Sequence, residues 1–420
     1  MTSLKSRFLA LLRWSERYTK TDMVYLTKGG FWLTTDYLLQ AGSGFLLAIV
    51  LANMVSKGDF GTYQFVISAA TIIGTFTLSG YAAALARASA AGEAGALPYA
   101  FRAQLAWNAF IAVAGGALAA FYFLQGDTSL GLAFIFVGAL LPFLTGFSLY
   151  ANFLIGKQDF RALALLGIWR KILPFAAVIS TISLTSNPAF LVLAYFSGHT
   201  VSAMLAYRGV CRKYPEPRQE HPEITRYAKH LSVMNILTTV ARNIDKIAVW
   251  YFLGAIPLAV YTLALTPVGF LQALLSHTST LALPKFTKRG VSELKTELPK
   301  KMPLYYAFVA LIALTYLVAA PLFFRLVFPA YPEAIVFSQL LVLALFTSPR
   351  ALLVQVFTAH EKKREQYIVS IATFLTKLCA FGVLVPIYGI YGAVAAVLVS
   401  ELAIAVIQVS LFTRLRGAER

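Results

Sequence analysis

The feature that most constrains this chain is the recurrence of apolar runs of about 20 residues along the whole sequence. An α-helix rises 1.5 Å per residue, so a run of this length crosses about 30 Å of hydrocarbon. Of the 420 residues, 59% are hydrophobic and only 13% are charged, a composition that a soluble domain does not have. We therefore predict an all-α polytopic membrane protein. The twelve runs that we interpret as membrane-spanning helices are residues 29–51, 61–85, 103–124, 130–155, 164–184, 188–207, 231–253, 258–282, 303–324, 335–357, 368–387 and 390–412.

The distribution of basic residues indicates which way the chain faces. The formal net charge is +18, and 28 of the 36 Lys and Arg residues lie at the two termini and in the loops after spans 2, 4, 6, 8 and 10. An excess of Lys and Arg marks the cytoplasmic side of a membrane protein, so both termini are predicted to be cytoplasmic. The positive charge therefore reflects topology, and it gives no reason to expect a nucleic-acid partner.

The two halves of the chain share a design. Residues 61–87 and 259–285 have Tyr63 and Tyr261 at the same place, and Lys171 and Lys377 each lie in the fifth span of a half. Six spans per half is an even number, so the halves are predicted to be parallel repeats related by an axis along the membrane normal. The predicted division is a basic amphipathic cytoplasmic segment (1–28), an N-terminal six-helix bundle (29–208), a cytoplasmic linker (209–230), a C-terminal six-helix bundle (231–413) and a cytoplasmic tail (414–420).

Charged residues occur inside the predicted spans, where an ionised group at a helix centre costs about 2.5 to 3.5 kcal/mol. Arg242 lies eleven residues after Leu231 and therefore about 16 Å into the bilayer. Six basic residues against three acidic ones leave an excess of positive charge, which predicts an anion-binding cavity between the halves. The predicted substrate-binding residues are Arg242, Lys246 and Lys377, helped by Arg170 and Lys171, together with Asn235 on the face of Arg242 and Gln40 on the face of Asp36. Arg350 is predicted to extend toward the cytoplasmic surface.

The three acidic residues within the spans have two possible roles. Asp36, Asp245 and Glu401 either bind a coupling ion or form internal salt bridges, and Asp245 is spaced to pair with Arg242. His199 and His277 either relay protons or form hydrogen bonds between helices. No catalytic residue, metal ligand or bound cofactor is predicted, other than a coupling H⁺ or Na⁺.

Two segments carry a resemblance to a known family. They are "ARNIDKIAVWYFLGAIPLAVYTLALTPVGFLQALLSHTSTLALPKFTK" (241–288) and "PIYGIYGAVAAVLVSE" (386–401). The chain resembles the Wzx-type polysaccharide and O-antigen flippases of the multidrug/oligosaccharidyl-lipid/polysaccharide exporter superfamily. That resemblance implies a V-shaped, MATE-like pair of bundles in the bacterial inner (cytoplasmic) membrane.

The resemblance also implies a substrate and partners. The substrate would be an undecaprenyl-diphosphate-linked oligosaccharide for O-antigen or exopolysaccharide assembly, moved by alternating access and driven by an ion gradient. Membrane lipids, a polysaccharide polymerase and a chain-length regulator would be partners.

The other functions fit the sequence less well. A multidrug cation antiporter of the same superfamily requires an acidic cavity, and a flippase for peptidoglycan precursors resembles a longer chain with fourteen spans. An integral-membrane glycan ligase or polymerase requires a large outward loop, whereas the outward loops near 52–60 and 325–334 have about ten residues. A purely structural scaffold leaves the buried cations unexplained. The sequence has no Gly-rich phosphate loop ending in Lys-Ser or Lys-Thr, so this chain is not expected to hydrolyse ATP or to be an enzyme.

Overall fold

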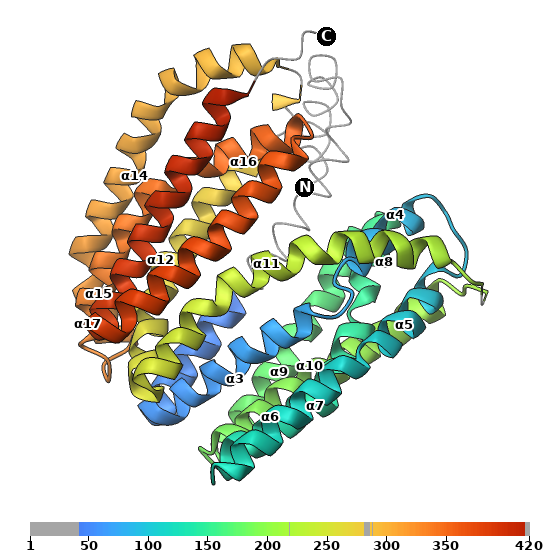
Figure 1. Ribbon diagram of the computed structural model, residues 1–420. Helices are drawn as coiled ribbons and strands as arrows, with labels where there is room; N and C mark the ends of the chain where they lie inside the picture. The colour runs from blue at the N-terminus through green and yellow to red at the C-terminus, as the bar shows by residue number, and fades with distance from the viewer. Residues whose placement is uncertain (1–41, 218, 281–285, 288, 416–420) are drawn as a thin grey trace, which may run out of the picture.

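The computed structural model describes residues 42–415 apart from residue 218, residues 281–285 and residue 288. All regular elements in this part of the chain are helices, which confirms the predicted all-α fold (Figure 1). Eight helical stretches within it are long and apolar enough to cross a membrane. The count of twelve spans and the side on which the termini lie stay predictions.

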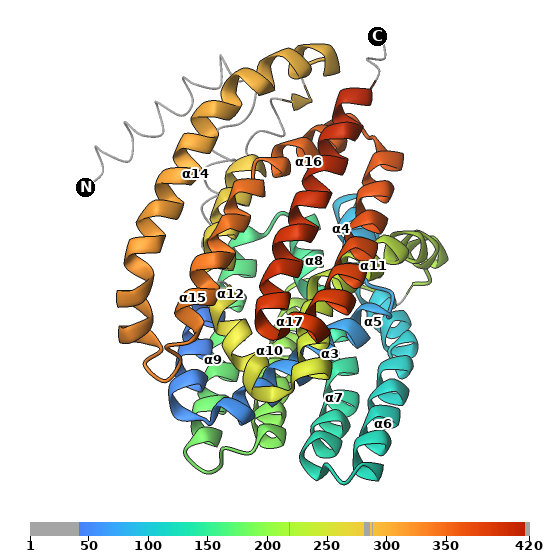
Figure 2. The same ribbon diagram turned by 60° about the vertical axis from the view of Figure 1, so that its left-hand side comes forward.

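Each predicted span within these residues has helix at its place. The N-terminal half contains a helix at Gly42–Met54, α3 (Lys57–Thr75), α4 (Tyr81–Ala90), α5 (Ala96–Trp107), α6 (Ala109–Leu124), α7 (Thr128–Phe147), α8 (Leu149–Gly156), α9 (Phe160–Ile182) and α10 (Pro188–Lys213). The C-terminal half contains α11 (Pro222–Leu253), α12 (Ala255–Thr280), α14 (Val291–Val327), α15 (Ala334–Leu341), the 3₁₀ turn η1 (Val342–Thr347), α16 (Arg350–Ala359) and α17 (Lys363–Arg414). Figure 2 shows α14 along the outer edge of the C-terminal half.

Helix α17 contains the last two predicted spans. Gly389 interrupts its helical backbone with a φ of 60° and a ψ of −135°. A side chain on Gly392 would place its Cβ 1.9 Å from the carbonyl oxygen of Leu384, so only glycine fits the reversal. This is the glycine-tyrosine turn of residues 386–392, and it lets the two arms of α17 pack against each other.

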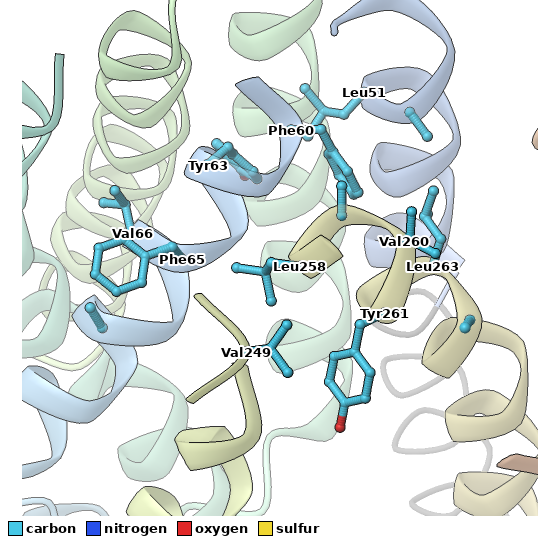
Figure 3. Close-up of a cluster of buried hydrophobic side chains, with 14 of the residues drawn as sticks. Leu51, Phe60, Tyr63, Phe65, Val66, Val249, Leu258, Val260, Tyr261 and Leu263 are labelled. Atoms are coloured by element: carbon cyan, nitrogen blue, oxygen red, sulfur yellow. The ribbon is translucent and has the colours of Figure 1, made fainter. Parts of the chain in front are cut away.

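The hydrophobic core shows how the two halves are joined. One cluster of buried side chains includes residues of both halves, such as Phe60 and Tyr63 from α3 with Leu258 and Tyr261 from α12 (Figure 3). Two smaller clusters lie apart from it, one around Tyr81 and Phe153 in the N-terminal half and one around Leu294 and Phe357 in the C-terminal half. The bundles therefore share a core at one end and have separate cores at the other, which gives the V shape visible in Figure 1.

The joined end carries the loops that the charge pattern predicts to face outward. The Asn53 side chain donates to the Val327 carbonyl over 2.8 Å, and Lys57 forms an ion pair with Glu333. The Lys57 ammonium also lies 5.0 Å from the centre of the Tyr331 ring. Gly61 makes the closest approach, because a Cβ there would lie 1.9 Å from the carbonyl oxygen of Ala255. The structure is thus closed at this joined end, which the charge pattern predicts to face outward.

The ion pair between Lys57 and Glu333 predicts a pH effect on this closure. Burial raises the pKa of Glu333, but the hydrogen bond from Lys57, a backbone hydrogen bond and the Lys57 charge together outweigh burial and hold the pKa below its ordinary value of 4.5. Above pH 4.5 the ion pair between Lys57 and Glu333 therefore stabilises the closed state of the joined end. This stabilisation is lost as the pH falls through the lowered pKa of Glu333. A pair this exposed contributes about 0.2 to 1 kcal/mol, so the expected shift in the closed population is about 1.5- to 5-fold.

Spin labels at Ser186→Cys and Tyr388→Cys, in a chain without Cys211 and Cys379, report this shift as a distance distribution. Lys57→Glu should increase the long-distance population, and the swapped pair Lys57→Glu with Glu333→Lys should restore it. An unchanged distribution in Lys57→Glu would show that the ion pair has no part in closure.

Candidate functional site

A polar cavity of about 710 Å³ lies within the N-terminal bundle, and we name it the chamber. Its wall comes from the helix at Gly42–Met54 and from α3, α7, α9 and α10, with one residue from α11. The polar side chains that line it are Ser43, Tyr63, Gln64, Thr71, Thr75, Thr145, Arg170, Lys171, Tyr195, His199 and Thr239. Two of these are cations, and no described carboxylate lines the chamber.

Helix α9 brings the two cations to the chamber wall. Pro174 lies inside α9 four residues after Arg170, so the Arg170 carbonyl has no N–H to accept from within the helix. Gly198 of α10 allows the two helices to meet here, because a Cβ on it would lie 2.6 Å from the Pro174 Cα. The proline and the glycine together fix the position of Arg170 and Lys171 opposite α10.

The charge of Arg170 is not neutralised within the described part of the chain. Its Nε is buried and has no hydrogen-bond partner there, and it forms no ion pair with a described carboxylate. Nearby, the His199 ring packs at 4.5 Å against Tyr195, which packs at 6.1 Å against Tyr63. A guanidinium with a buried, unpartnered N–H can bind an anion that enters the chamber.

Helix α11 extends this basic surface beyond the chamber. Thr239 lines the chamber, and Arg242 and Lys246 follow it on the same side of the helix, within about 60° at 100° per residue. Asn235 lies one turn before Thr239 on the same side and is exposed. Among the described residues, neither Arg242 nor Lys246 forms an ion pair. The α11 cations therefore follow the chamber residue Thr239 along α11 in the direction of the joined end.

An apolar groove of about 310 Å³ adjoins the chamber, and we name it the lateral groove. It shares Ser43, Lys171 and Phe175 with the chamber and is otherwise lined by Gly42, Leu46, Ile168 and Ile172. Leu46 and Ile172 are 54% and 49% exposed, so within the described residues the groove opens to the side of the bundle. Lys171 thus stands at the boundary between a polar space and an apolar one.

The family of the chain follows from its sequence. Residues 26–290, more than half of the chain, match the family model described as "Polysaccharide biosynthesis protein". The chain belongs to the polysaccharide biosynthesis protein family. No curated protein matches its sequence.

Solved structures share the fold of this family member. The lipid II flippase MurJ in an inward closed conformation aligns with a TM-score of 0.72 at 10% identity, covering 92% of this chain and 88% of MurJ. An inward-facing MATE family multidrug transporter aligns with a TM-score of 0.65 at 14% identity, over 90% and 94% of the two chains. A transporter from Pyrococcus furiosus with a binding pocket of reverse polarity aligns at 0.62 and 14% identity, over 93% and 94%. The predicted membership of the exporter superfamily is confirmed.

Two of the predicted acidic residues are engaged within the C-terminal bundle of this polysaccharide biosynthesis protein. Glu401 forms an ion pair with Arg350, and the Thr347 hydroxyl lies 3.4 Å from the same carboxylate. Tyr261 donates to one oxygen of Asp245 over 3.0 Å, and the other oxygen of Asp245 is buried with no hydrogen-bond partner among the described residues. Arg350 is therefore held by a carboxylate, a pairing that the sequence did not predict.

The structure separates the other predicted site residues. Arg170 and Lys171 line the chamber, and Arg242, Lys246 and Asn235 lie beside it on α11. Lys377 is half-buried on the first arm of α17, in the opposite bundle. Asp245 does not lie on the side of α11 that carries Thr239, because it is turned about 120° from Thr239 and faces Tyr261. Asp36 and Gln40 lie outside the described residues.

Several chamber residues were missed at the level of sequence. Gln64, Thr71 and Thr75 of α3 all line the chamber, and their spacing of seven and four residues places them on one side of a helix. A row of polar side chains on one side of an otherwise apolar span could have predicted that this side of α3 faces a polar cavity. Tyr63, Thr145 and Tyr195 gave no comparable signal, because tyrosine and threonine are common in membrane helices that only pack together.

Proposed function

We propose that the protein is a flippase that moves an undecaprenyl-diphosphate-linked oligosaccharide across the bacterial inner membrane for O-antigen or exopolysaccharide assembly. The observation that carries this proposal is the junction at Lys171, where a basic polar chamber meets an apolar groove that opens to the side. A lipid-linked glycan has the matching division into an anionic polar head and an apolar tail. Membership of the polysaccharide biosynthesis family supports the same substrate class.

The parts of such a substrate correspond to parts of the site. The diphosphate would bind Arg170 and Lys171, because a guanidinium grips phosphate oxygens with two hydrogen bonds and an ammonium adds a mobile charge. Sugar hydroxyls would bind Gln64, Thr145 and Tyr195, and a chamber of about 710 Å³ holds a head group of a few sugar rings. The polyprenyl tail would lie in the lateral groove and remain in the lipid.

Transport by this site requires the closed outward end to open. In alternating access the bundles rock about a site that stays between them, so the head group reaches the other side without leaving the protein. Arg242 and Lys246 follow Thr239 along α11 in the direction of the joined end and would guide the diphosphate outward. Lys377, on the opposite bundle, would contact the head group as the bundles rearrange.

An ion gradient is the proposed source of energy. The Asp245 carboxylate has a buried, unpartnered oxygen, which makes it a candidate for a coupling H⁺ or Na⁺. Glu401 could bind the coupling ion only after breaking its ion pair with Arg350, and Asp36 is the third candidate.

We propose no catalytic role for the protein. We propose a polysaccharide polymerase and a chain-length regulator as its partners. The rival function of a cation antiporter is disfavoured, because the described chamber wall has two cations and no acid.

The lateral groove gives a direct test of the proposed function. Ile172→Trp should fill the groove and slow flipping of a fluorescent polyprenyl-diphosphate oligosaccharide in proteoliposomes about tenfold, which corresponds to about 1.4 kcal/mol of lost tail binding. The measurement is the fraction of label that becomes inaccessible to an external quencher with time. Leu165→Trp, two turns earlier on α9 and equally exposed at 45%, is the control and should keep the rate within about twofold.

Two outcomes would reject this assignment. The first is a wild-type protein that moves an organic cation and leaves the lipid-linked glycan in place. The second is an equal flipping rate for Ile172→Trp and the wild type, which would show that the polyprenyl tail does not lie in the lateral groove.

A further inference from the structure

A cluster of metal-ligating groups lies away from the chamber, where the α4–α5 turn meets the first turn of α11. Glu93 is in the turn, His221 directly precedes α11, and Glu223 is in its first turn. One ring nitrogen of His221 and one oxygen from each carboxylate all lie within 4.8 Å of one another. In Figure 1 this is the end of α11 that lies beside α4 and α5. The proposed transport function uses none of these residues.

The hydrogen bonds of His221 define which nitrogen is available. Its Nε2 lies 2.7 Å from the backbone carbonyl oxygen of Ala94, which can only accept, so Nε2 bears the hydrogen. Its Nδ1 faces Glu223 Oε1 at 3.1 Å and Glu93 Oε2 at 3.8 Å. A lone pair that faces two carboxylates is repelled by them, so a cation belongs at this place, either a proton on Nδ1 or a metal ion between the three groups.

The Glu93 side chain, 38% exposed as a whole, directs one oxygen at the same place. Its Oε2 is buried and has no hydrogen-bond partner within the described residues. A buried carboxylate oxygen without a partner is costly, and a bound metal ion satisfies it. The His221 side chain is only 13% exposed, and the Tyr99 ring packs edge-on against it at 6.0 Å, so the imidazole is held in place.

We propose that His221 Nδ1, Glu93 and Glu223 bind a divalent transition-metal ion of the Zn²⁺ type, with water completing its coordination. One imidazole and two carboxylates form a ligand set that suits zinc, whereas Ca²⁺ and Mg²⁺ prefer oxygen alone. A histidine ligand typically donates its second N–H to a backbone carbonyl, as His221 does to Ala94. The Glu223 side chain is exposed, so it can rotate to bring its carboxylate oxygen within bonding distance of the ion.

The ion would fasten the linker between the bundles to the N-terminal bundle. The linker already packs closely there, since a Cβ on Gly95 would lie 2.6 Å from the Pro217 carbonyl oxygen. Thr225, one turn into α11, accepts or donates hydrogen bonds with both Tyr81 and Tyr99, at 2.6 and 2.9 Å. Helix α11 continues from this anchor into the C-terminal bundle, so the ion would fix the starting point of the helix that joins the two halves.

The test uses the untagged full-length protein in lipid nanodiscs, stripped with a chelator and titrated with Zn²⁺ alone. We expect one Zn²⁺ per chain by calorimetry and by metal analysis, and a thermal midpoint that rises with Zn²⁺ and not with Mg²⁺. His221→Ala and Glu93→Gln should each weaken Zn²⁺ binding at least about tenfold. Glu220→Gln is the matched control, because Glu220 is exposed, adjacent to the cluster in sequence and paired with Arg102, and it should bind Zn²⁺ as the wild type does.

X-ray absorption at the zinc edge of the wild-type protein needs no variant and should show nitrogen and oxygen ligands without sulfur. Absence of Zn²⁺ binding, binding that survives both substitutions, or sulfur ligation would each overturn the proposal. A midpoint that follows pH through His221 and ignores Zn²⁺ would also overturn it, since the cation would then be a proton. These outcomes leave the proposed transport function untouched, because flipping is measured separately.

Discussion

Arg170→Ala is expected to leave the protein folded and inserted while reducing glycan export by about tenfold to a hundredfold, since a hydrogen bond to a charged group contributes about 1.5 to 3 kcal/mol. Arg170 is the chamber cation with a buried Nε and no hydrogen-bond partner in the described residues. Under the proposed function, its removal would leave Lys171 as the one cation of the described chamber wall to hold the diphosphate. The measurement is surface polysaccharide in cells that depend on the variant, normalised to the amount of protein in the membrane.

Two further variants show whether the effect of Arg170 comes from charge and position. Arg170→Lys keeps the charge without the two parallel hydrogen bonds and should recover part of the export. Arg161→Ala removes an exposed arginine at the start of the same helix and should export normally. Normal surface polysaccharide in Arg170→Ala would exclude the chamber as the site of the diphosphate.

Gly61→Ala is expected to prevent closure of the outward end. The added Cβ would lie 1.9 Å from the Ala255 carbonyl oxygen, and because that atom belongs to the backbone, α3 and α12 must move apart. Overpacking of this kind costs about 1 to 3 kcal/mol, which shifts the closed population about 5- to 150-fold. The spin-label pair at residues 186 and 388 should then report mainly long distances, and flipping should stop, because one of the two states of the transport cycle is missing.

Gly58→Ala is the matched control on the same helix. A Cβ at Gly58 meets only the Ser56 hydroxyl at 3.8 Å, so alanine fits there without strain. The distance distribution and the flipping rate should both remain those of the wild type. If Gly61→Ala behaved in the same way, the contact between α3 and α12 would not be a pivot.

The fold was accessible from the sequence because a membrane restricts the chain so strongly. Apolar runs of about 20 residues locate helices with little ambiguity, since every backbone group in hydrocarbon must bond within its own segment. The breaks inside spans were less accessible. Residues 76–80 separate α3 from α4, and η1 interrupts the span that α15 begins, although neither segment has a polar run to mark it. Packing between neighbouring helices, which hydropathy does not record, produces these breaks.

The candidate site was only half predictable. Sequence position gives the depth of a residue in the membrane, which is why Arg242 stood out, but it does not give the direction in which a helix turns that residue. Asp245 is three residues from Arg242 and faces Tyr261 instead of the basic face. The pairing of Arg350 with Glu401 joins residues 51 positions apart and depends on the packing of α16 against α17. The chamber itself required the close contact of Gly198 with Pro174, which only tertiary structure reveals.

The shared core of the two bundles has a consequence for the cell. The contact between the bundles at the joined end consists mainly of stacked rings and aliphatic side chains, such as Phe65 against Trp250 at 4.4 Å. Apolar contacts of this kind are hardly weakened by ions that screen surface charges. If the protein is the proposed flippase, this end should therefore stay closed to solutes at very different salt concentrations.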